Sequence, residues 1–415
     1  MRASTSPAAQ TTNDVTQSDA PLRWAIMSLL AVAVSLGMSL WFTASATATQ
    51  LAARWALAPA QATALTTSVQ IGFVIGTAVA AVLNLADIIA ARWYFAICAF
   101  AAGVANAALA IVPVFELAIF CRVLTGFFLA GVYPPAMKMV ATWFRSGRGL
   151  AIGVLVGALT VGKATPYLVA AFAAVDYRVV ALSTSAGAAL AAVLVAVAYT
   201  DGPHPFPRRA FSWSLVGVLA RHRATRLAIG GYLGHMWELY ACWAALSLFF
   251  LDFFRSRGYT DLESASLSGV LAFTSIAAGG VGSVMAGVWA DRLGRELIAS
   301  AAMAVSGACA LAIGWLTSAP VWFVATIAVV WGFAVVADSA QFSALVTEVA
   351  PTHAVGTALT LQTSLGFLLT AASIWLTIDV AGRWGWGVAF SLLAAGPAFG
   401  IWQMLLLDRI RKNRF

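Results

Sequence analysis

The first candidates for chemistry are the few charged side chains that interrupt long apolar stretches of the sequence. Two cations, Arg122 and Lys163, lie in such stretches in the first half of the chain, and two acids, Glu238 and Asp338, lie in the second half. A charge inside an apolar membrane segment usually faces the protein interior and marks a substrate or ion pathway. Cations in one half and titratable acids in the other predict a site that binds an anion and exchanges protons.

A short polar stripe around Glu238 is the predicted place for proton exchange. His235 stands three residues before Glu238, so both side chains share one helix face, which Tyr232 extends. Burial favours the neutral form of a carboxyl group, and histidine titrates near neutral pH. We therefore predict proton coupling at Glu238 and His235, with a static hydrogen bond between them as the structural alternative. Asp338 is a third candidate, either as a proton acceptor or as the partner of a cation across the cavity.

The predicted substrate site is built on the two cations. Lys163 is expected to face a central cavity, and Arg122 either faces it too or donates hydrogen bonds to the backbone. Lys138 lies near the end of its apolar stretch, where its ammonium can reach the membrane interface. Six further side chains are expected to line the cavity: Trp41, Thr43, Trp237, Trp331, Gln341 and Gln362.

The composition excludes an ordinary soluble protein. Hydrophobic residues make up 61% of the chain and charged residues 10%, whereas a soluble domain carries about 25% charged residues. The net charge of +8 is interpreted as a topology signal, so no nucleic acid partner is expected. The four cysteines all fall inside apolar stretches and lack metal-ligand spacing. We expect no metal, no cofactor and no enzymatic activity.

Twelve apolar segments recur along the chain, each near the roughly 20 residues that a helix needs to cross a bilayer. The expected spans are 22–46, 62–85, 93–113, 115–141, 149–173, 179–199, 226–251, 265–289, 297–317, 321–347, 354–378 and 384–407. They predict two six-helix bundles, 22–199 and 226–407, joined by a central loop, 200–225. A disordered tail, 1–21, and a basic tail, 408–415, flank them.

The positive charges between the spans predict the orientation. With the amino terminus inside, 16 Lys and Arg residues fall in inside segments and 5 in outside segments. Cytoplasmic loops carry the excess of Lys and Arg. Both termini are therefore expected to be cytoplasmic, in a bacterial-type inner membrane. The lipid bilayer is the expected surrounding partner, and a monomer suffices for the fold.

The two halves echo each other at the same offset. Gly126-Phe127 in the fourth span precedes Gly332-Phe333 in the tenth span by 206 positions. Two similar halves in parallel register are typical of transporters that rock around a site near the membrane midplane. Chance similarity between helices rich in Gly and Ala is the alternative.

The sharpest motif lies between the eighth and ninth spans. The segment 287–295 reads Gly-Val-Trp-Ala-Asp-Arg-Leu-Gly-Arg and resembles the Gly-x-Leu-Ala-Asp-Arg-x-Gly-Arg signature of the major facilitator superfamily. Leu85-Ala86-Asp87 with Arg92 is a degenerate first-half copy, and Arg122 with Gly126 matches the family's Arg-x-x-x-Gly motif. The resemblance implies an all-α membrane protein, the family's twelve-helix fold in two pseudo-symmetric bundles, and a secondary transporter that works by alternating access.

The loop motif also implies a cytoplasmic gate. Its candidate residues are Asp87, Arg92, Arg148, Asp291, Arg292 and Arg295. A carboxylate at such a helix end can face the positive amino-terminal end of a helix from the other half, Asp87 at span eleven and Asp291 at span five. A topogenic charge cluster in a tight turn is the alternative, and for Asp87 both interpretations are open.

Three functions remain open at this point. The first is a proton-coupled carrier of a small organic anion. The second is a proton-driven exporter of amphipathic compounds, although the fifth span, 149–173, lacks the antiporter motif of such exporters. The nitrate porters' signature is also absent, despite a general similarity in spans four and five. The third is a transporter-like membrane sensor that binds a ligand without moving it.

Overall fold

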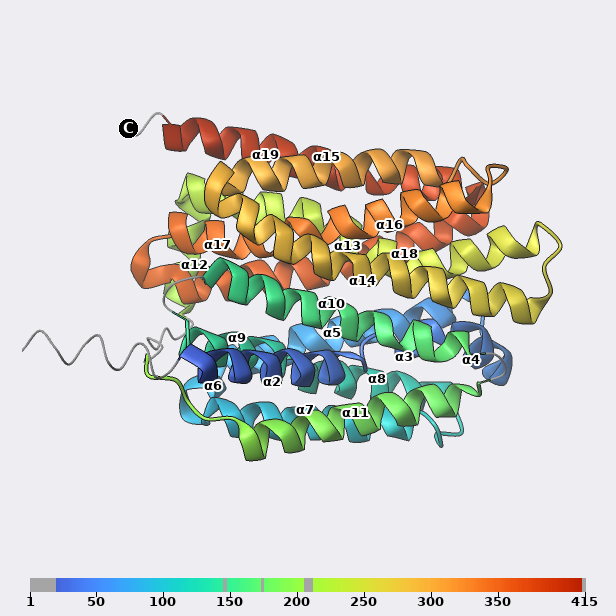
Figure 1. The fold of residues 1–415 in the computed structure, drawn as a ribbon, viewed down its shortest axis with the longest axis horizontal. Coiled ribbons are helices and arrows are strands. Elements are labelled where there is room, and N and C mark those ends of the chain that lie inside the picture. The colour runs from blue at the N-terminus through green and yellow to red at the C-terminus, as the bar shows by residue number, and fades with distance from the viewer. Residues whose placement is uncertain (1–19, 145–147, 173–174, 205–211, 413–415) are drawn as a thin grey trace, which may run out of the picture.

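The chain folds into a bundle of long helices that run between two ends of the molecule (Figure 1). The computed structural model describes residues 20–144, 148–172, 175–204 and 212–412, and within these ranges its regular secondary structure is helical. The first residue of α2 (Ala20–Met38) and the last of α19 (Ala395–Lys412) lie at the same end. We call this the terminal end, and the opposite one the far end.

The helices before residue 200 form one group. They follow α2 in the order α3 (Thr43–Ala46), α4 (Ala48–Trp55), α5 (Pro59–Val82), α6 (Leu85–Ile88), α7 (Ala91–Ala108), α8 (Phe115–Leu129), α9 (Tyr133–Ala141), α10 (Arg148–Ala171) and α11 (Tyr177–Ala198).

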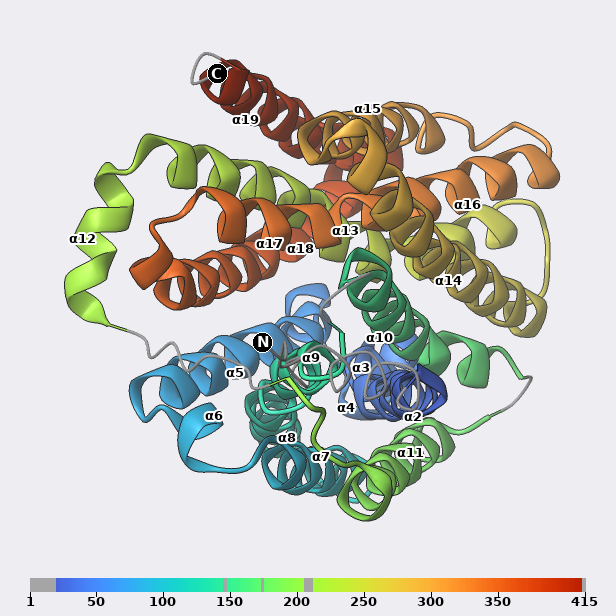
Figure 2. The ribbon, with the colours of Figure 1, turned by 60° about the vertical axis from the view of Figure 1, so that its left-hand side comes forward.

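The helices after residue 212 form a second group. They are α12 (Trp213–Arg221), α13 (Arg223–Arg255), α14 (Asp261–Leu293), α15 (Arg295–Ile313), α16 (Val321–Ala337), α17 (Ser339–Val349), the short η1 (Thr352–Ala354), α18 (Val355–Leu393) and α19. Figure 2 shows the two groups on opposite sides of the bundle, with α12 at the outer edge near α17 and α18.

Every expected span is occupied by helix; three spans are interrupted and two are joined. The first breaks at 39–42, the fourth at 130–132 and the tenth at Asp338. Pro134 and Pro135 directly follow the second break, where proline cannot supply the backbone donor that a continuous helix needs. The last two spans share α18, which bends at Gly385 (φ 83°), a backbone conformation that glycine adopts freely.

The outer surface is apolar, as a multi-pass membrane protein requires. Within the described ranges, nine helical segments are long and apolar enough to cross a membrane, and one of them, Val355–Lys412, is 58 residues long. A helix rises 1.5 Å per residue, so that segment has the length of two crossings. Large apolar side chains such as Ile111, Val197 and Trp322 are at least 70% exposed, which suits contact with lipid.

The two groups meet along two pairs of helices. The helix α10 packs along α14, and α5 packs along α18; α10 and α14 lie side by side between the groups in both views (Figures 1 and 2). The first pair joins spans five and eight and the second joins spans two and eleven. In a molecule built from two similar six-helix units, span five corresponds to span eleven and span two corresponds to span eight. The two pairs of helices are therefore equivalent contacts.

Glycine allows the same close helix crossing once in each group. A Cβ on Gly126 of α8 would overlap the carbonyl oxygen of Val69 in α5. A Cβ on Gly332 of α16 would overlap the carbonyl oxygen of Ser275 in α14. Ser275 follows Val69 by 206 positions, the same offset that separates the two glycines. Small residues are what allow backbones to approach this closely in membrane helices, which gives the sequence echo a physical cause.

Candidate functional site

Lys163 lies between the two groups of helices, fully buried and surrounded by aromatic rings. Its Nζ donates a hydrogen bond to the hydroxyl of Tyr240. The same atom is 3.9 Å from the centroid of the Trp41 ring and 4.4 Å from that of Tyr240. None of the ion pairs found in the described residues includes Lys163. The ammonium is therefore held by ring faces and one phenol rather than by a carboxylate.

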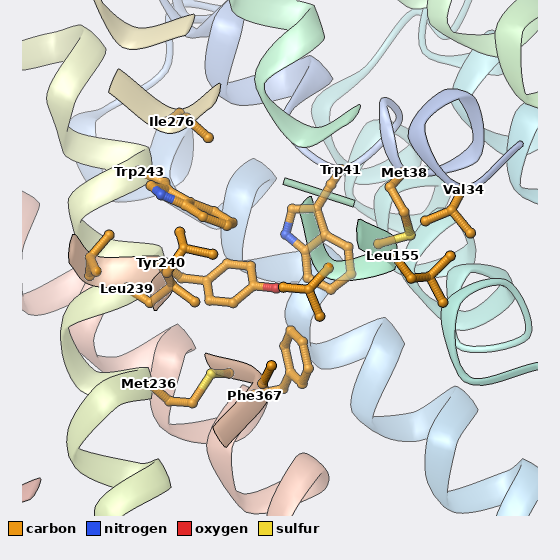
Figure 3. Close-up of a cluster of buried hydrophobic side chains, with 14 of the residues drawn as sticks. Val34, Met38, Trp41, Leu155, Met236, Leu239, Tyr240, Trp243, Ile276 and Phe367 are labelled. Carbon is orange, nitrogen blue, oxygen red and sulfur yellow. The ribbon is translucent and has the colours of Figure 1, made fainter. Parts of the chain in front are cut away.

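Several elements from both groups position this cage. Trp41 comes from the break after α2, Lys163 from α10, Tyr240 from α13 and Phe367 from α18. We define the central cluster as these four residues with Phe73 of α5 and Trp243 of α13. Figure 3 shows the side chains of Trp41, Tyr240 and Phe367 directed toward one another. Their three ring centroids are 5.2–5.5 Å apart, within the usual range for aromatic pairs.

Two indole N–H groups of the central cluster find no acceptor in the described part of the chain. The Nε1 atoms of Trp41 and Trp243 are buried and have no hydrogen-bond partner among the described residues. Buried polar groups are nearly always paired in native structures, so an unpaired donor needs an explanation. Lys163 lies over the Trp41 ring, so its ammonium and the unpaired N–H of Trp41 place positive charge and a donor close together, without a matching anion among the described residues.

Arg122 serves the backbone of the first group. Its guanidinium donates to the carbonyl oxygens of Leu40 (3.2 Å) and Trp41 (2.6 Å) and to Oδ1 of Asn106 (2.7 Å). The break between α2 and α3 frees these carbonyl groups, and lipid offers them no partner. Of the two roles left open by the sequence, this geometry favours the structural one. Thr43 belongs to the same region, because its hydroxyl lies 3.3 Å from that of Thr184.

Glu238 lies inside the second group and both of its carboxylate oxygens are occupied. Ser306 of α15 donates to Oε2 at 2.8 Å, and the indole of Trp331 donates to Oε1 at 2.7 Å. Trp331, expected in the substrate cavity, is therefore a partner of Glu238. Tyr240 follows Glu238 by two residues, so it points about 200° away around the helix axis. One helix, α13, thus carries the central cluster on one face and Glu238 on another.

His235 and Asp338 form a second buried contact between α13 and the tenth span. His235 Nδ1 lies 2.8 Å from Asp338 Oδ1, and its Nε2 lies 3.0 Å from the hydroxyl of Ser339. Asp338 stands at the break between α16 and α17. His235 thus contacts Asp338, whereas the structural alternative assumed a hydrogen bond between His235 and Glu238. Asp338 pairs with neither Arg122 nor Lys163.

A network of charged side chains covers the terminal end of the second group. Arg295 donates to Glu348 Oε1 (2.6 Å) and to Gln341 Oε1 (3.0 Å), and lies 3.3 Å from Asp291. Arg411 of α19 bonds the other oxygen of Glu348 at 3.1 Å. Gln341, expected to line the substrate cavity, therefore contacts the motif arginine instead. The network ties α15, α17 and α19 together.

The motif carboxylate Asp291 reaches the other group of helices. Its Oδ2 lies 2.7 Å from the position that a Cβ of Gly149 would occupy, at the amino-terminal end of α10. A side chain at this position would displace the carboxylate of Asp291. The positive end of the helix dipole faces this carboxylate, an interaction typically worth about 0.3–1 kcal/mol at an exposed site.

The remaining sequence candidates are scattered. Arg292 is exposed. Arg92 donates to the carbonyl of Tyr199 at 3.5 Å, within the first group. Trp237 donates to the carbonyl of Leu392 at 3.1 Å, within the second. Gln362 is buried and its Oε1 lacks a donor among the described residues. The side chains of Asp87 and Arg148 lie outside the described part of the structure.

Sequence reasoning missed four of the six residues of the central cluster. Tyr240, Trp243, Phe73 and Phe367 are aromatic residues in apolar helices, where most aromatic side chains serve packing. The spacing of Tyr240 and Trp243, three residues apart, places them on one helix face, but Phe250 and Phe253 further along α13 have the same spacing. Asn106 and Ser306, the polar partners of Arg122 and Glu238, were also missed, since neither is charged.

Comparison with known proteins gives a consistent result. The model of the Major Facilitator Superfamily matches residues 27–374. The structure is similar to a bacterial homolog of the human lysosomal transporter Spinster (TM-score 0.66, 14% identity, 93% of this chain and 94% of that one). It is also similar to the nucleoside transporter NupG (0.67, 15%, 92% and 99%) and to the human organic anion transporter MFSD10 (0.65, 14%, 92% and 99%). None of the curated proteins matches the chain.

Proposed function

Because this chain belongs to the Major Facilitator Superfamily, we propose that it is a secondary transporter that carries a small organic anion across the inner membrane, coupled to protons. The observation that carries the proposal is Lys163, a fully buried cation at the junction of the two groups. At this level of identity the solved relatives share the fold alone, so their differing substrates do not choose one for this chain.

The electrostatics of the central cluster favour an anion. Burying an unpaired ammonium costs several kcal/mol, and contacts with aromatic faces return about 0.5–2 kcal/mol each. An anion that accepts from Lys163 and from the indole of Trp41 would balance the remaining cost. The two acids buried in the described part of the chain, Glu238 and Asp338, contact Trp331, Ser306 and His235, so they do not neutralise Lys163.

The acids of the second group are the proposed proton sites. Glu238 and the His235–Asp338 pair both lie between α13 and the tenth span, away from Lys163. Neither has a Lys or Arg partner in the described ion pairs. Because α13 also carries Tyr240, a change of protonation at Glu238 can shift the helix that contacts Lys163. This arrangement supports coupling between two separate sites.

Proton movement in proteoliposomes tests the proposed function. Vesicles holding a pH dye are given gradients of carboxylates, sulfonates or inorganic anions, and protein-free vesicles measure the passive leak of each acid. We expect at least one organic anion to move protons faster with the protein than without it, and Lys163→Ala to abolish the difference. Equal rates in all three preparations for every anion would contradict the proposal.

Glu238→Gln is expected to stop proton-coupled movement without unfolding the protein. The amide oxygen can still accept from Trp331, and the amide nitrogen can donate to Ser306, whose hydroxyl already points at the carbonyl of Met303 (3.2 Å). The hydrogen bonds are conserved, so stability should change by about 1 kcal/mol or less. The measurement pairs thermal unfolding with the vesicle assay, where the initial rate should fall at least tenfold.

Glu238→Ala is the matched variant that separates stability from coupling. It leaves the indole N–H of Trp331 buried without an acceptor, which costs about 1–3 kcal/mol, so its melting temperature should drop clearly. If Glu238→Gln moved protons with the anion as fast as the natural protein, Glu238 would be a structural residue and His235 with Asp338 would be the remaining proton site.

We also propose that Asp291 and Gly149 form a cytoplasmic gate, with both termini inside as the excess of Lys and Arg indicates. Gly149→Val is expected to loosen this end, because its side chain would take the space of the Asp291 carboxylate. Cysteine labelling from inside-out vesicles measures the effect, with Ser283→Cys as the probe in α14. Ser283 is fully buried opposite Gly153 of α10, so its labelling rate should rise severalfold.

Gly217→Val is the control for the gate. Gly217 is also helical, in α12, and a Cβ there would meet nothing within 4 Å, so labelling should stay at its original rate. The four natural cysteines give the background in protein without the probe. An unchanged rate in Gly149→Val would assign the Asp291 contact to topology rather than to gating.

A further inference from the structure

We propose that the anion is a monocarboxylate whose body is a flat apolar ring, bound with its carboxylate on Lys163 and its ring among Trp41, Tyr240 and Phe367. This inference rests on the proposed function and names the chemical class of its substrate. It follows from the charge count, the donors and the ring geometry of the central cluster.

The charge count selects a single negative charge. Lys163 is the one cation that contacts the central cluster in the described part of the chain, and Arg122 is engaged with Asn106 and backbone carbonyls. A monoanion makes the site neutral, whereas a dianion would leave one negative charge buried without a partner. An uncompensated buried charge costs several kcal/mol, so dicarboxylates and phosphate dianions are disfavoured.

The donors suit a carboxylate. A carboxylate has two oxygens with about four acceptor positions, and an ammonium has three N–H groups. The indole Nε1 of Trp41 is unpaired and, in Figure 3, lies on the side of its ring that faces Tyr240 and Trp243. The phenol of Tyr240 accepts from Lys163 and can also donate through its own O–H. One carboxylate can thus accept from Lys163, Trp41 and Tyr240 together.

The rings suit a flat apolar body. Trp41 and Phe73 belong to the first group of helices, and Tyr240 and Phe367 to the second. The ring pairs Trp41–Tyr240, Trp41–Phe367 and Phe73–Phe367, at 4.4–5.5 Å, therefore join the two groups. When the two groups of helices separate, each ring of these pairs loses the aromatic face that it contacts. A flat ring inserted between them restores contacts on both sides, and aromatic pairs contribute beyond the area that they bury.

Binding of six small molecules to the full chain in detergent tests the inference. The probes are benzoate, cyclohexanecarboxylate, acetate, benzamide, phthalate and nitrate, and the measurement is titration calorimetry. Benzoate should bind best. Benzamide, its neutral counterpart, should bind at least about tenfold more weakly, the usual loss for a charged hydrogen bond. Cyclohexanecarboxylate should be weaker by about two- to tenfold, the range for an aromatic contact.

Two variants separate the inference from the proposed function. Phe367→Leu should keep benzoate binding but remove its preference over cyclohexanecarboxylate, while Lys163→Met should lose all anions. If phthalate or nitrate bound as well as benzoate and still required Lys163, the ring-monocarboxylate inference would be overturned and the anion carrier would stand. If no anion bound, or if Lys163→Met bound them unchanged, both would fall.

Discussion

Lys163→Met is expected to raise the melting temperature of the protein alone and to abolish its stabilisation by anions. The ammonium is fully buried among aromatic rings, and none of the described residues offers it a carboxylate partner. Replacing it by a thioether of similar length removes the cost of burying a charge, several kcal/mol, and gives up the hydrogen bond to Tyr240 and two close cation–π contacts worth about 0.5–2 kcal/mol each. The net change in the free energy of unfolding should favour the variant by about 1 kcal/mol or more.

The same substitution removes the anion's only cationic partner in the central cluster. Truncating one member of a buried charge pair typically costs about 2–5 kcal/mol of binding free energy, so affinity should fall roughly 30-fold or more. Thermal unfolding in detergent, with and without benzoate, measures both effects in one experiment. A bound ligand stabilises the folded protein by about 2.7 kcal/mol at a hundredfold excess over its Kd, which the natural protein should show.

Lys138→Met is the control for this prediction. Lys138 is in α9, near the terminal end of the fourth span, so its replacement should leave the anion response intact. If Lys163→Met kept the full response to benzoate, Lys163 would not be the anion site. If apolar amines instead stabilised the natural protein and Lys163→Met equally, the exporter hypothesis would replace the anion carrier.

Arg122→Ala is expected to have the largest effect on folding. The guanidinium bonds the carbonyl groups of Leu40 and Trp41 and the amide oxygen of Asn106. The carbonyl of Leu40 keeps its bond from the N–H of Thr43 (3.5 Å), whereas the carbonyl of Trp41 and the amide oxygen of Asn106 lose their partner. Each acceptor left unpaired in a buried site costs about 1–3 kcal/mol, so the free energy of unfolding should fall by roughly 2–5 kcal/mol. Size-exclusion profiles of the detergent-solubilised protein should show mostly aggregated material at 37 °C.

Two further variants define what Arg122 does. Arg122→Lys should rescue only part of the loss, because one ammonium cannot reproduce the planar fork that reaches three acceptors. Arg92→Ala, which removes one long hydrogen bond to Tyr199 (3.5 Å), should fold normally. A well-folded Arg122→Ala that no longer responded to anions would restore the substrate role that the sequence left open.

The sequence predicted the helices better than the contacts between them. Apolar length placed all twelve spans, because a helix must satisfy its own backbone in lipid. It could not place the break at 39–42, because the carbonyl groups of Leu40 and Trp41 that this break frees accept from Arg122, some 80 positions away. It also did not place the break at Asp338.

Residue type found the charges of the site but not their partners. Lys163, Glu238 and His235 are unusual in apolar segments, so the sequence singled them out. The partners that each side chain contacts depend on how the helices pack against one another, and the helical period of a sequence does not show that packing. Trp331 and Gln341 therefore bind Glu238 and Arg295, whereas the sequence placed them in the cavity.

In a carrier that alternates between the two sides of the membrane, the one cation that the described residues place in the central cluster would make the transport cycle depend on the membrane voltage. Under the proposed function, the site is neutral when an anion occupies it and carries one positive charge when it does not. A site open to the cytoplasm shares the cytoplasmic potential, so an interior-negative voltage favours that orientation for the unoccupied carrier by up to about 2.3 kcal/mol per 100 mV. While Glu238 stays protonated, the voltage leaves the crossing of the loaded carrier unaffected and biases the direction in which the unoccupied carrier returns. A proton released from Glu238 before the return would leave a carboxylate that cancels the charge of Lys163 and would remove this bias.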